Sequence, residues 1–324
     1  MIQCLLDLSE QSANLARLIR EDKDLFQLLI ASKDQRANGE PDFKTLADVL
    51  IQSTFKYGVK RQFPGHNITV MGEEDGTFPL KSGEHVELEI TEDPENTARL
   101  LSKVLKSPGV VEKLCSAIHR TVSVHDGSLE QIAPGQLLPE DLSVWIDPID
   151  STKSYISGDA KLESVTVLVG VHHAGLPILG VVTYPFTREQ IWGLAHNGYK
   201  LSNVPVPNVT GPIKTVVLSR WETDKMVDKL RSSGFQTEAP TGAGFKLGTV
   251  IKGEASFYLV TASTTFQWDT CGPHAILRAL GGDIELFGKP GTPLRYTHST
   301  DPNVGFIAYL DSGALARLRQ SLKD

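Results

Sequence analysis

The sequence predicts a mixed α/β protein, and three observations lead to this fold class. Apolar residues recur at helical spacing, with charges between them, through residues 1–32. Three apolar segments of strand length follow one another closely between residues 164 and 195, and expected strands and helices alternate from residue 213 onward. With 324 residues, 40% of them hydrophobic, the chain can form one large domain or two.

The composition limits the classes of partner. The formal net charge of −7, without a basic stripe, argues against a nucleic-acid partner. No run of about 18 apolar residues occurs, and Asp7 and Glu10 interrupt the N-terminus, so we expect neither a membrane span nor a signal peptide. Cys4, Cys115 and Cys271 are odd in number and far apart, which is typical of reduced thiols. We therefore expect a cytoplasmic protein. A monomer is also expected, although none of these observations bears on the oligomeric state.

The N-terminal segment supplies one carboxylate of interest. We expect one long or two short amphipathic helices in residues 1–32, a polar loop in residues 32–41, and a helix that is capped by Asp42 and continues to about Tyr57. Asp48 falls at the edge of the apolar face of this last helix. A carboxylate there usually belongs to a solvated helix face, so a functional role for Asp48 depends on other ligands nearby.

A short strand at residues 66–71 leads into an acidic segment. We interpret this arrangement as a strand that delivers Glu73 and Glu74 at its end, although an acidic turn closed by Gly76 explains the same residues. Residues 77–92 favour a polar hairpin or a loop, which precedes a further helix.

The most informative stretch is Trp145-Ile146-Asp147-Pro148-Ile149-Asp150-Ser151-Thr152, an apolar run that stops in two carboxylates and two hydroxyls. Residues 143–146 favour a buried strand, and Pro148 lacks the N–H that would extend a sheet, so we expect a turn there. The turn can direct Asp147 and Asp150 toward one point, with the Ile149 carbonyl between them, as a site for a hard cation. A surface turn explains the same residue types, so the assignment depends on further ligands.

Two segments offer groups that bind anions. Ser151 and Thr152 open a helical turn whose free backbone N–H groups favour a phosphate. A second approach to a helix combines small residues with one cation, in the sequence Gly242-Ala243-Gly244-Phe245-Lys246. Such a loop can surround an anion, although a tight turn is the more frequent explanation of a single G-x-G.

The rest of the chain favours an antiparallel meander followed by alternating strands and helices. The expected meander strands are residues 164–171, 178–184 and 190–195. The expected later strands are residues 213–219, 255–260 and 306–309, and the helices are residues 223–232, 244–251, 269–280 and from about 312. Trp268-Asp269 places a carboxylate in the first turn of a helix, where N-capping alone explains it. No HExxH, GxSxG or P-loop motif occurs, so any chemistry must come from carboxylates.

Three of these segments, taken in chain order, carry a resemblance to a known enzyme family. They resemble the metal signature of the lithium-sensitive, magnesium-dependent phosphomonoesterases, which include inositol monophosphatases and nucleotide bisphosphate phosphatases. The segments are Gly72-Glu73-Glu74, Asp147 to Thr152, and Trp268-Asp269. The similarity covers nearly the whole chain. Within the family, residues 42–50, 242–246 and 264–269, and Ser151 where many relatives have glycine, resemble the inositol polyphosphate 1-phosphatases most.

The resemblance implies a fold and a set of metal ions. The implied fold is a layered αβαβα sandwich of the inositol monophosphatase and fructose-1,6-bisphosphatase type, with an N-terminal half over residues 1–160, a C-terminal half over residues 161–324, and the metal cluster between them. Two to three Mg²⁺ ions are implied, with Mn²⁺ as a substitute and Li⁺ and Ca²⁺ as inhibitors. Two carboxylates about 4 Å apart repel by roughly 4 kcal/mol at an effective dielectric near 20, so converging carboxylates require cations. Oxygen ligands favour Mg²⁺ or Mn²⁺ over zinc.

The resemblance also assigns roles to residues. The implied metal ligands are Glu73, Glu74, Asp147, the Ile149 carbonyl, Asp150 and Asp269. The implied catalytic residues are Asp48 and Thr152, which would orient the attacking water, together with Glu73. The implied substrate-binding residues are Asp150, Ser151, Thr152, Ser219, Glu222, Gly242, Ala243, Gly244 and Lys246.

The implied activity is hydrolysis of the 1-phosphate of inositol 1,4-bisphosphate and inositol 1,3,4-trisphosphate, which are small-molecule substrates. One alternative is a 3′(2′),5′-bisphosphate nucleotidase, which shares the metal core and would be favoured by a flat aromatic surface near the pocket. The alternative outside enzymes is a protein that binds inositol phosphates in a metal-dependent way without hydrolysing them.

Overall fold

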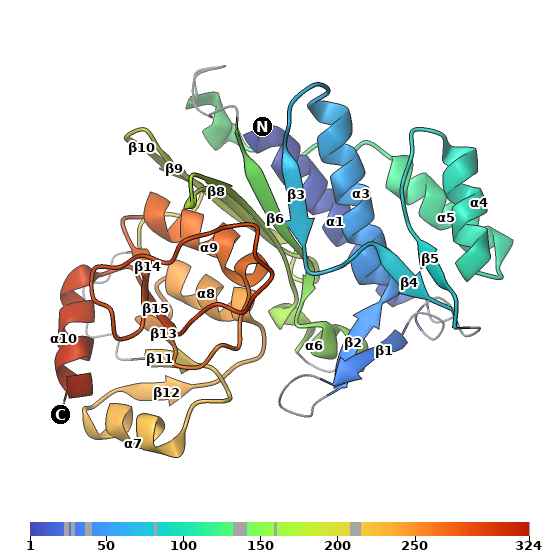
Figure 1. The fold of residues 1–324 in the computed structure, drawn as a ribbon. Coiled ribbons are helices and arrows are strands. Elements are labelled where there is room, and N and C mark those ends of the chain that lie inside the picture. The colour runs from blue at the N-terminus through green and yellow to red at the C-terminus, as the bar shows by residue number, and fades with distance from the viewer. Residues whose placement is uncertain are drawn as a thin grey trace.

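Two large sheets, two two-stranded sheets and three layers of helices form the described part of the protein in the computed structural model, which covers residues 1–22, 26, 30–35, 41–80, 83–131, 141–158, 161–207 and 215–323. The larger sheet has six strands in the order β10-β9-β8-β7-β6-β3, and the smaller has five in the order β12-β11-β13-β15-β14. Figure 1 shows the two sheets side by side with helices between them and on their outer faces.

The six-stranded sheet is antiparallel except at one edge, where β3 runs parallel to β6. Its strands are β3 (Thr69–Gly72), β6 (Ser143–Asp150), β7 (Thr166–His173), β8 (Leu176–Tyr184), β9 (Glu189–His196) and β10 (Tyr199–Ser202). The meander expected from the sequence is confirmed as β7, β8 and β9. The domain boundary expected near residue 160 falls between β6 and β7, which are neighbours in this sheet, and the division stays a prediction.

The five-stranded sheet is mixed. Its strands are β11 (Thr215–Leu218), β12 (Gln236–Glu238), β13 (Phe257–Val260), β14 (Asp283–Leu286) and β15 (Phe306–Tyr309). β11 is parallel to β12 and β13, whereas β15 is antiparallel to β13 and β14. The sequence analysis predicted β11, β13 and β15 but not β12 or β14, because β12 has only three residues and both strands are rich in polar residues.

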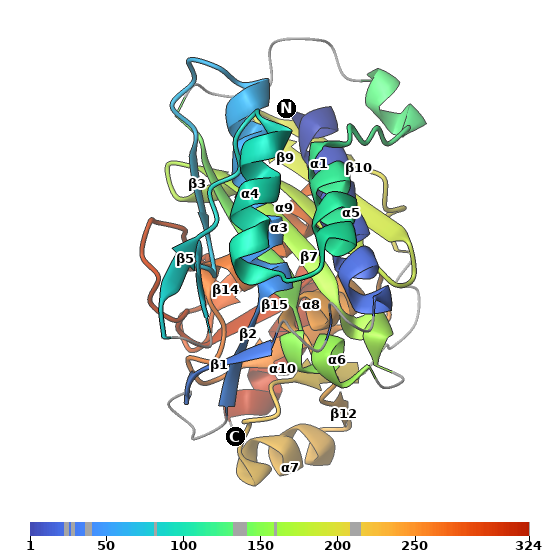
Figure 2. The ribbon, with the colours of Figure 1, turned by 90° about the vertical axis from the view of Figure 1, so that its right-hand side faces the viewer.

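The helices complete a layered αβαβα sandwich, as predicted. They are α1 (Ile2–Glu21), α3 (Leu46–Gln62), α4 (Pro94–Val104), α5 (Pro108–His119), α6 (Thr152–Ser157), α7 (Asp224–Ser232), α8 (Ala243–Ile251), α9 (Gln267–Ala279) and α10 (Ser312–Lys323), with 3₁₀ turns at Gly127–Gln131 and Leu162–Ser164. α1 and α3 cover one face of the six-stranded sheet, and α8 and α9 lie between the two sheets. α7 and α10 flank the five-stranded sheet, while α4 and α5 lie outside α1 and α3 (Figure 2).

The N-terminal expectations need correction. Ile30–Gln35 forms strand β1, which pairs with β2 (Pro41–Thr45), where the sequence favoured helix and loop; residues 36–40 of that expected loop lie outside the described residues. A second short hairpin, β4 (Thr77–Pro79) with β5 (His85–Glu87), confirms the predicted one. Asp42 lies in β2 and does not cap α3. Thr45 caps it instead, because its hydroxyl accepts from the Asp48 amide at 3.2 Å.

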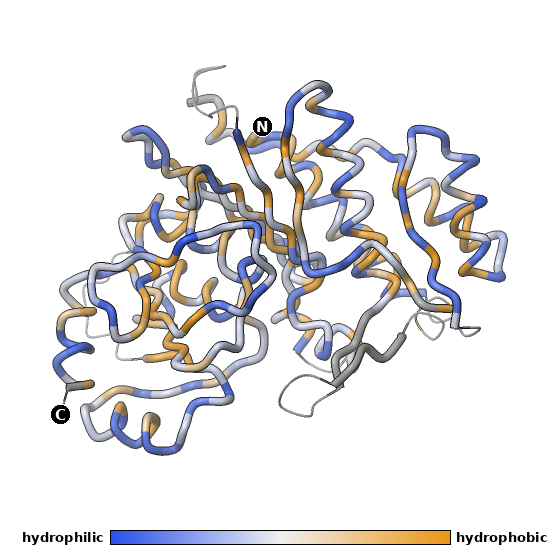
Figure 3. Tube along the Cα trace, in the orientation of Figure 1, coloured by the Kyte–Doolittle hydropathy of each residue, from blue (hydrophilic) through white to orange (hydrophobic). Residues whose placement is uncertain are grey.

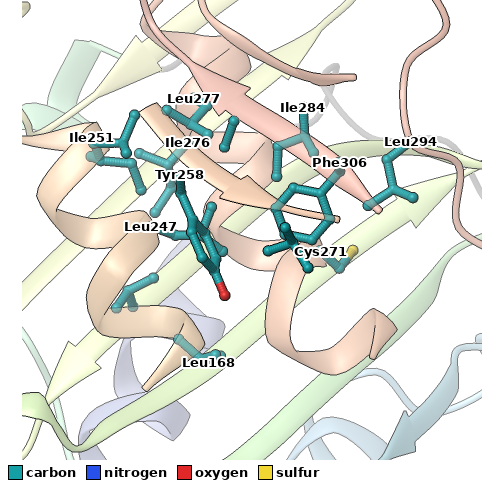
Figure 4. Close-up of a cluster of buried hydrophobic side chains, with 14 of the residues drawn as sticks. Leu168, Leu247, Ile251, Tyr258, Cys271, Ile276, Leu277, Ile284, Leu294 and Phe306 are labelled. Atoms are coloured by element: carbon teal, nitrogen blue, oxygen red, sulfur yellow. The ribbon is translucent and has the colours of Figure 1, made fainter. Parts of the chain in front are cut away.

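The core between the sheets fixes the position of α9. In this core, side chains of α8, α9 and both sheets pack against one another. Figure 4 shows this packing for Leu168, Leu247, Tyr258, Cys271 and Phe306. The hydropathy colours of Figure 3 show hydrophobic residues along β3 and β6. Met71 and Trp145 pack into the core between the sheets, whereas Val70 and Ile146 belong to the cluster on the other face.

A row of glycines brings α9 close to the six-stranded sheet. Gly170, Gly180 and Gly193 pair with one another across β7, β8 and β9. A Cβ on Gly180 would lie 1.9 Å from the carbonyl oxygen of Gly272 in α9, so only glycine permits this approach. The close contact places the first turn of α9 against the end of β6.

Candidate metal centre and active site

A bulge in β6 brings two carboxylates to the same face of the strand. β6 continues through Pro148 to Asp150, so the turn expected at Pro148 does not form. Asp147 pairs with Leu168, and Asp150 pairs with Thr166. Between these two pairs the chain advances by three residues in β6 but by only two in β7, so β6 contains one extra residue. The extra residue restores the same side-chain orientation at both aspartates, on the face covered by α9.

Asp269 joins these two carboxylates from the first turn of α9. Its carboxylate accepts a hydrogen bond of 2.6 Å from the Phe266 amide, so Asp269 caps α9, as the N-capping interpretation predicted. The same carboxylate also faces Asp147 and Asp150. Carboxylate oxygens of Asp147, Asp150 and Asp269 lie within 4.8 Å of one another, and all three residues are buried. Burial, and then the charge of Asp150, raises the pKa of Asp269 to about 8.

Asp150 is held by the segment that the sequence analysis offered as an anion-binding loop. Its carboxylate accepts the backbone amides of Ala243 at 3.2 Å and Gly244 at 2.8 Å, and the hydroxyl of Thr166 at 3.1 Å. Burial raises the pKa of Asp150, and the two amides oppose that shift. Helix α8 begins directly after Gly242, which has a φ of 83°. The first turn of this helix therefore orients the carboxylate of Asp150.

Asp48 is buried beside the acidic segment after β3. It is 1% exposed, so the interpretation as a solvated helix face is wrong. Its Oδ2 atom accepts the amide of Thr45 at 2.9 Å and the hydroxyl at 2.5 Å, whereas Oδ1 has no hydrogen-bond partner among the described residues. Burial, followed by the charges of Glu74 and Glu73, raises the pKa of Asp48.

Glu73 links this carboxylate to the cluster on β6. Its charge contributes to the raised pKa of Asp147, whose largest cause is burial, and also to that of Asp269. Glu74 is 5% exposed. The structure thus gathers the five predicted acidic positions and Asp48 around the end of β6.

The turn after β6 places the remaining predicted groups. The hydroxyl of Thr152 donates to the carbonyl of Ile149 at 3.0 Å, and the amide of Ile149 donates to Asp147 at 3.1 Å. Ser151 precedes α6 in the left-handed conformation, with a φ of 73°. Because glycine adopts the left-handed conformation without a steric cost, glycine would fit position 151 without backbone strain.

Lys246 is a cation beside the cluster. Its side chain is buried, and its ammonium nitrogen lies 5.0 Å from the centre of the Tyr258 ring. Burial lowers the pKa of Lys246 to about 8, against the effect of Asp150 and Asp269. Of the other predicted substrate contacts, Ser219 lies 3.4 Å from the Thr264 hydroxyl, and Glu222 accepts the amide and hydroxyl of Thr261.

The chemistry of this cluster fits a divalent cation. Every donor is an oxygen, the carboxylates repel one another, and burial disfavours their charged forms unless a cation is bound. Asp147, Asp150 and Asp269 form the one group of three convergent metal-ligand side chains found in the described part of the chain.

Sequence reasoning missed two supporting residues. Thr45 was detectable, because Thr45 and Asp48 have the spacing of a capping box before an apolar run. Thr166 gave no local signal, since the carboxylate that it binds is 16 residues away in the neighbouring strand.

Comparison with known proteins places the chain in a family. The sequence profile described as the Inositol monophosphatase family matches residues 109–308, which is more than half of the chain. The chain belongs to this family. Inositol polyphosphate 1-phosphatase of Mus musculus is 36% identical over 322 residues, with 86% of this chain and 81% of the mouse protein covered. The protein of that name from Homo sapiens is 35% identical, with the same coverage.

Other proteins similar to this chain carry different names. A 3′(2′),5′-bisphosphate nucleotidase 1 of Rattus norvegicus is 30% identical, with 86% of this chain and 80% of the rat protein covered. The inositol monophosphatase from Zymomonas mobilis has the same fold, with a TM-score of 0.58, 15% identity and coverage of 100% and 97% of the two chains. CysQ from Bacteroides thetaiotaomicron, described as a bacterial family member, gives a TM-score of 0.57, 17% identity and coverage of 95% and 97%.

Family membership fixes the class of reaction. The chain is a phosphomonoesterase of the inositol monophosphatase family, whose members are metal-dependent, and its buried acidic cluster is suited to hold the metal. Within the described residues, every helix is too short or too polar to cross a membrane.

Proposed function

We propose that this enzyme removes the 1-phosphate of inositol 1,4-bisphosphate and inositol 1,3,4-trisphosphate in a Mg²⁺-dependent, Li⁺-inhibited reaction. The observation that carries the metal chemistry is the convergence of Asp147, Asp150 and Asp269 within 4.8 Å in a buried site. The substrate assignment is supported by 36% identity to an inositol polyphosphate 1-phosphatase, against 30% to a bisphosphate nucleotidase. Lys246 supplies a buried cation for a second phosphate.

In this proposal the chain holds two to three Mg²⁺ ions, for which Mn²⁺ can substitute and with which Li⁺ and Ca²⁺ interfere. Glu73, Asp147 and the Ile149 carbonyl hold one ion, and Asp147, Asp150 and Asp269 hold a second. Glu74 contributes to a looser site. When bound, such ions lower the pKa of water and neutralise charge on the leaving oxygen.

The side chains around the ions position the reactants. Asp48 and Thr152, with Glu73, orient the attacking water. The Oδ1 atom of Asp48, which has no hydrogen-bond partner within the described ranges, is an acceptor for the proton of that water. The backbone amides of Ser151 and Thr152 hold the phosphate that is removed. The inositol ring and its second phosphate contact Asp150, Ser219, Glu222, Gly242, Ala243, Gly244 and Lys246.

A direct comparison of substrates tests the proposal. Phosphate release is measured from inositol 1,4-bisphosphate, 3′-phosphoadenosine 5′-phosphate and inositol 1-phosphate, each with and without Mg²⁺ and millimolar Li⁺. We expect Mg²⁺-dependent, Li⁺-sensitive release mainly from the inositol bisphosphate. Release of the 1-phosphate alone, followed by ³¹P NMR, checks the position of attack. Equal or faster release from inositol 1-phosphate contradicts the substrate assignment.

One observation favours the nucleotidase as the second candidate. Trp221 is 42% exposed and lies shortly after β11, two residues beyond Ser219. Its ring offers an aromatic surface on which a nucleotide base can stack. Preference for the nucleotide in the same assay would support this candidate and leave the metal chemistry unchanged. Metal-dependent binding of inositol 1,4-bisphosphate without release of phosphate would instead favour the binding-protein alternative.

We also propose that the enzyme acts as a cytoplasmic monomer. The three cysteines are free, Cys115 and Cys271 being buried, which suits a reducing compartment. Analytical sedimentation at assay concentration tests whether the enzyme is a monomer, and fractionation of the source cells tests whether it is cytoplasmic.

A further inference from the structure

Gln52 connects α3 to the acidic segment after β3. It lies one helical turn after Asp48 and is 1% exposed. Its Nε2 atom donates to the carbonyl of Glu74, and its Oε1 atom accepts the amide of Glu74 at 3.0 Å. One side-chain amide therefore binds both backbone groups of a single residue, which fixes the orientation of that peptide segment.

The glycine before the acidic pair leaves room for this contact. A Cβ on Gly72 would lie 2.1 Å from Oε1 of Gln52 and 2.7 Å from the carbonyl oxygen of Ile146. Gly72 is also the last paired residue of β3, opposite Ile146 in β6. Glu73 thus lies between two fixed points, the sheet at Gly72 and the side chain of Gln52 at Glu74.

We propose that Gln52 is a positioning residue, which fixes the backbone at Glu74 so that the Glu73 carboxylate is presented to Asp147 before a metal ion binds. The proposal rests on the proposed function, because it assigns Glu73 to the metal site. Without Gln52 the amide and carbonyl of Glu74 would lose these two hydrogen bonds, and less of the segment's order would be in place before Mg²⁺ binds. Outer partners that orient metal ligands typically change metal affinity by about 10- to 100-fold.

A matched pair of variants separates positioning from general stability. Gln52→Met keeps the size of the side chain and removes both hydrogen bonds. The control is Gln11→Met, because Gln11 is also a buried glutamine whose Nε2 atom donates to backbone carbonyls, at 2.6 Å to Ile118 and 3.1 Å to Arg120, in a helix junction away from the cluster.

Mg²⁺ binding to each metal-free protein is measured by titration calorimetry without substrate, alongside the Mg²⁺ dependence of phosphate release. We expect Gln52→Met to bind Mg²⁺ about 10- to 100-fold more weakly and to need correspondingly more Mg²⁺ for half-maximal activity, with kcat at saturating Mg²⁺ close to wild type. Gln11→Met should lose comparable thermal stability and bind Mg²⁺ as wild type does. Equal Mg²⁺ affinity in the two variants overturns the proposal.

Hydrogen exchange in the wild-type protein supplies a test that needs no variant. The amide of Glu74 should exchange slowly in the metal-free protein and change little when Mg²⁺ is added. Rapid exchange that slows only with Mg²⁺ would show that the metal orders the segment and would overturn the proposal. A wild-type protein that neither binds Mg²⁺ nor releases phosphate contradicts the proposed function itself, which is a separate result.

Discussion

The carboxylate of Asp150 accepts a hydrogen bond of 2.8 Å from the backbone amide of Gly244, 94 residues away in the sequence. This contact joins the end of β6 to the first turn of α8, which Figure 1 shows between the two sheets. Because the amides at a helix N-terminus carry partial positive charge, the contact favours the ionised form of Asp150. A group proposed to bind metal is thus oriented by the segment proposed to bind substrate.

Gly244→Ala should disturb this contact. A Cβ at this position would lie 2.4 Å from Oγ1 of Thr166 and 2.6 Å from Cδ2 of Leu168, both in a packed interior. We expect a loss of about 1–3 kcal/mol in the free energy of unfolding and roughly a tenfold higher Mg²⁺ requirement, measured by denaturant unfolding and by Mg²⁺ titration of activity. Gly109→Ala, in α5 with no atom within 4 Å of the new methyl group, should not lower the free energy of unfolding, because alanine has the higher helix propensity, and it should leave the Mg²⁺ requirement near wild type. An unchanged Mg²⁺ requirement in Gly244→Ala would contradict this prediction.

Asp48→Asn should abolish turnover while the protein stays folded. The amide oxygen can still accept from Thr45, but the group no longer accepts a proton from water. We expect phosphate release to fall by about 100-fold or more at saturating Mg²⁺. Because burial raises the pKa of Asp48, the neutral side chain should not lower the thermal stability of the metal-free protein. Retention of more than about a tenth of the wild-type rate would remove Asp48 from the mechanism.

The stability of the metal-free protein should depend on pH through Asp269. Its pKa is raised from 3.8 to about 8 in the folded protein, so its protonated form favours folding and this contribution is lost as the pH rises from about 4 to 8. We expect the melting temperature in EDTA to fall over this range more steeply for wild type than for Asp269→Asn, which mimics the protonated acid.

Added Mg²⁺ should raise the melting temperature of wild type more than that of Asp269→Asn. At pH 8 Mg²⁺ should raise the melting temperature of wild type strongly and that of Asp269→Asn only weakly, and the variant should need much more Mg²⁺ for activity. If Asp269 serves only the first turn of α9, both proteins should respond equally to Mg²⁺, and that outcome would exclude it as a ligand.

Ser151→Gly should stabilise the protein. Ser151 has a φ of 73°, a conformation that glycine adopts without steric cost. We expect a gain of up to about 1 kcal/mol in the free energy of unfolding, by chemical denaturation in EDTA. Ser102→Gly, in the exposed part of α4, should instead lose about 0.5 kcal/mol. A loss at both positions would show that the hydroxyl of Ser151 contributes more than the strain costs.

Local sequence patterns were sufficient for many elements. The short apolar segments that predict β7, β8 and β9 are recognised from neighbouring residues alone, and so is the carboxylate in the first turn of α9. Asp42 was a wrong choice of cap because two capping residues lie close together; the capping-box spacing of Thr45 and Asp48 favours Thr45, and their reciprocal bonds confirm it. Strand β1 was missed because its pairing with β2, and not its own periodicity, makes it a strand.

The sequence by itself determined which residues could supply the chemistry: carboxylates at the ends of strands and the start of a helix, without a histidine, cysteine or serine motif. Only the tertiary structure decided that Asp48 is buried, that a bulge turns Asp147 and Asp150 to one face, and that Gly244 binds Asp150. The physical reason is distance along the chain. Burial and these hydrogen bonds arise between segments up to 94 residues apart, and their energies exist only after the sheets and helices have packed.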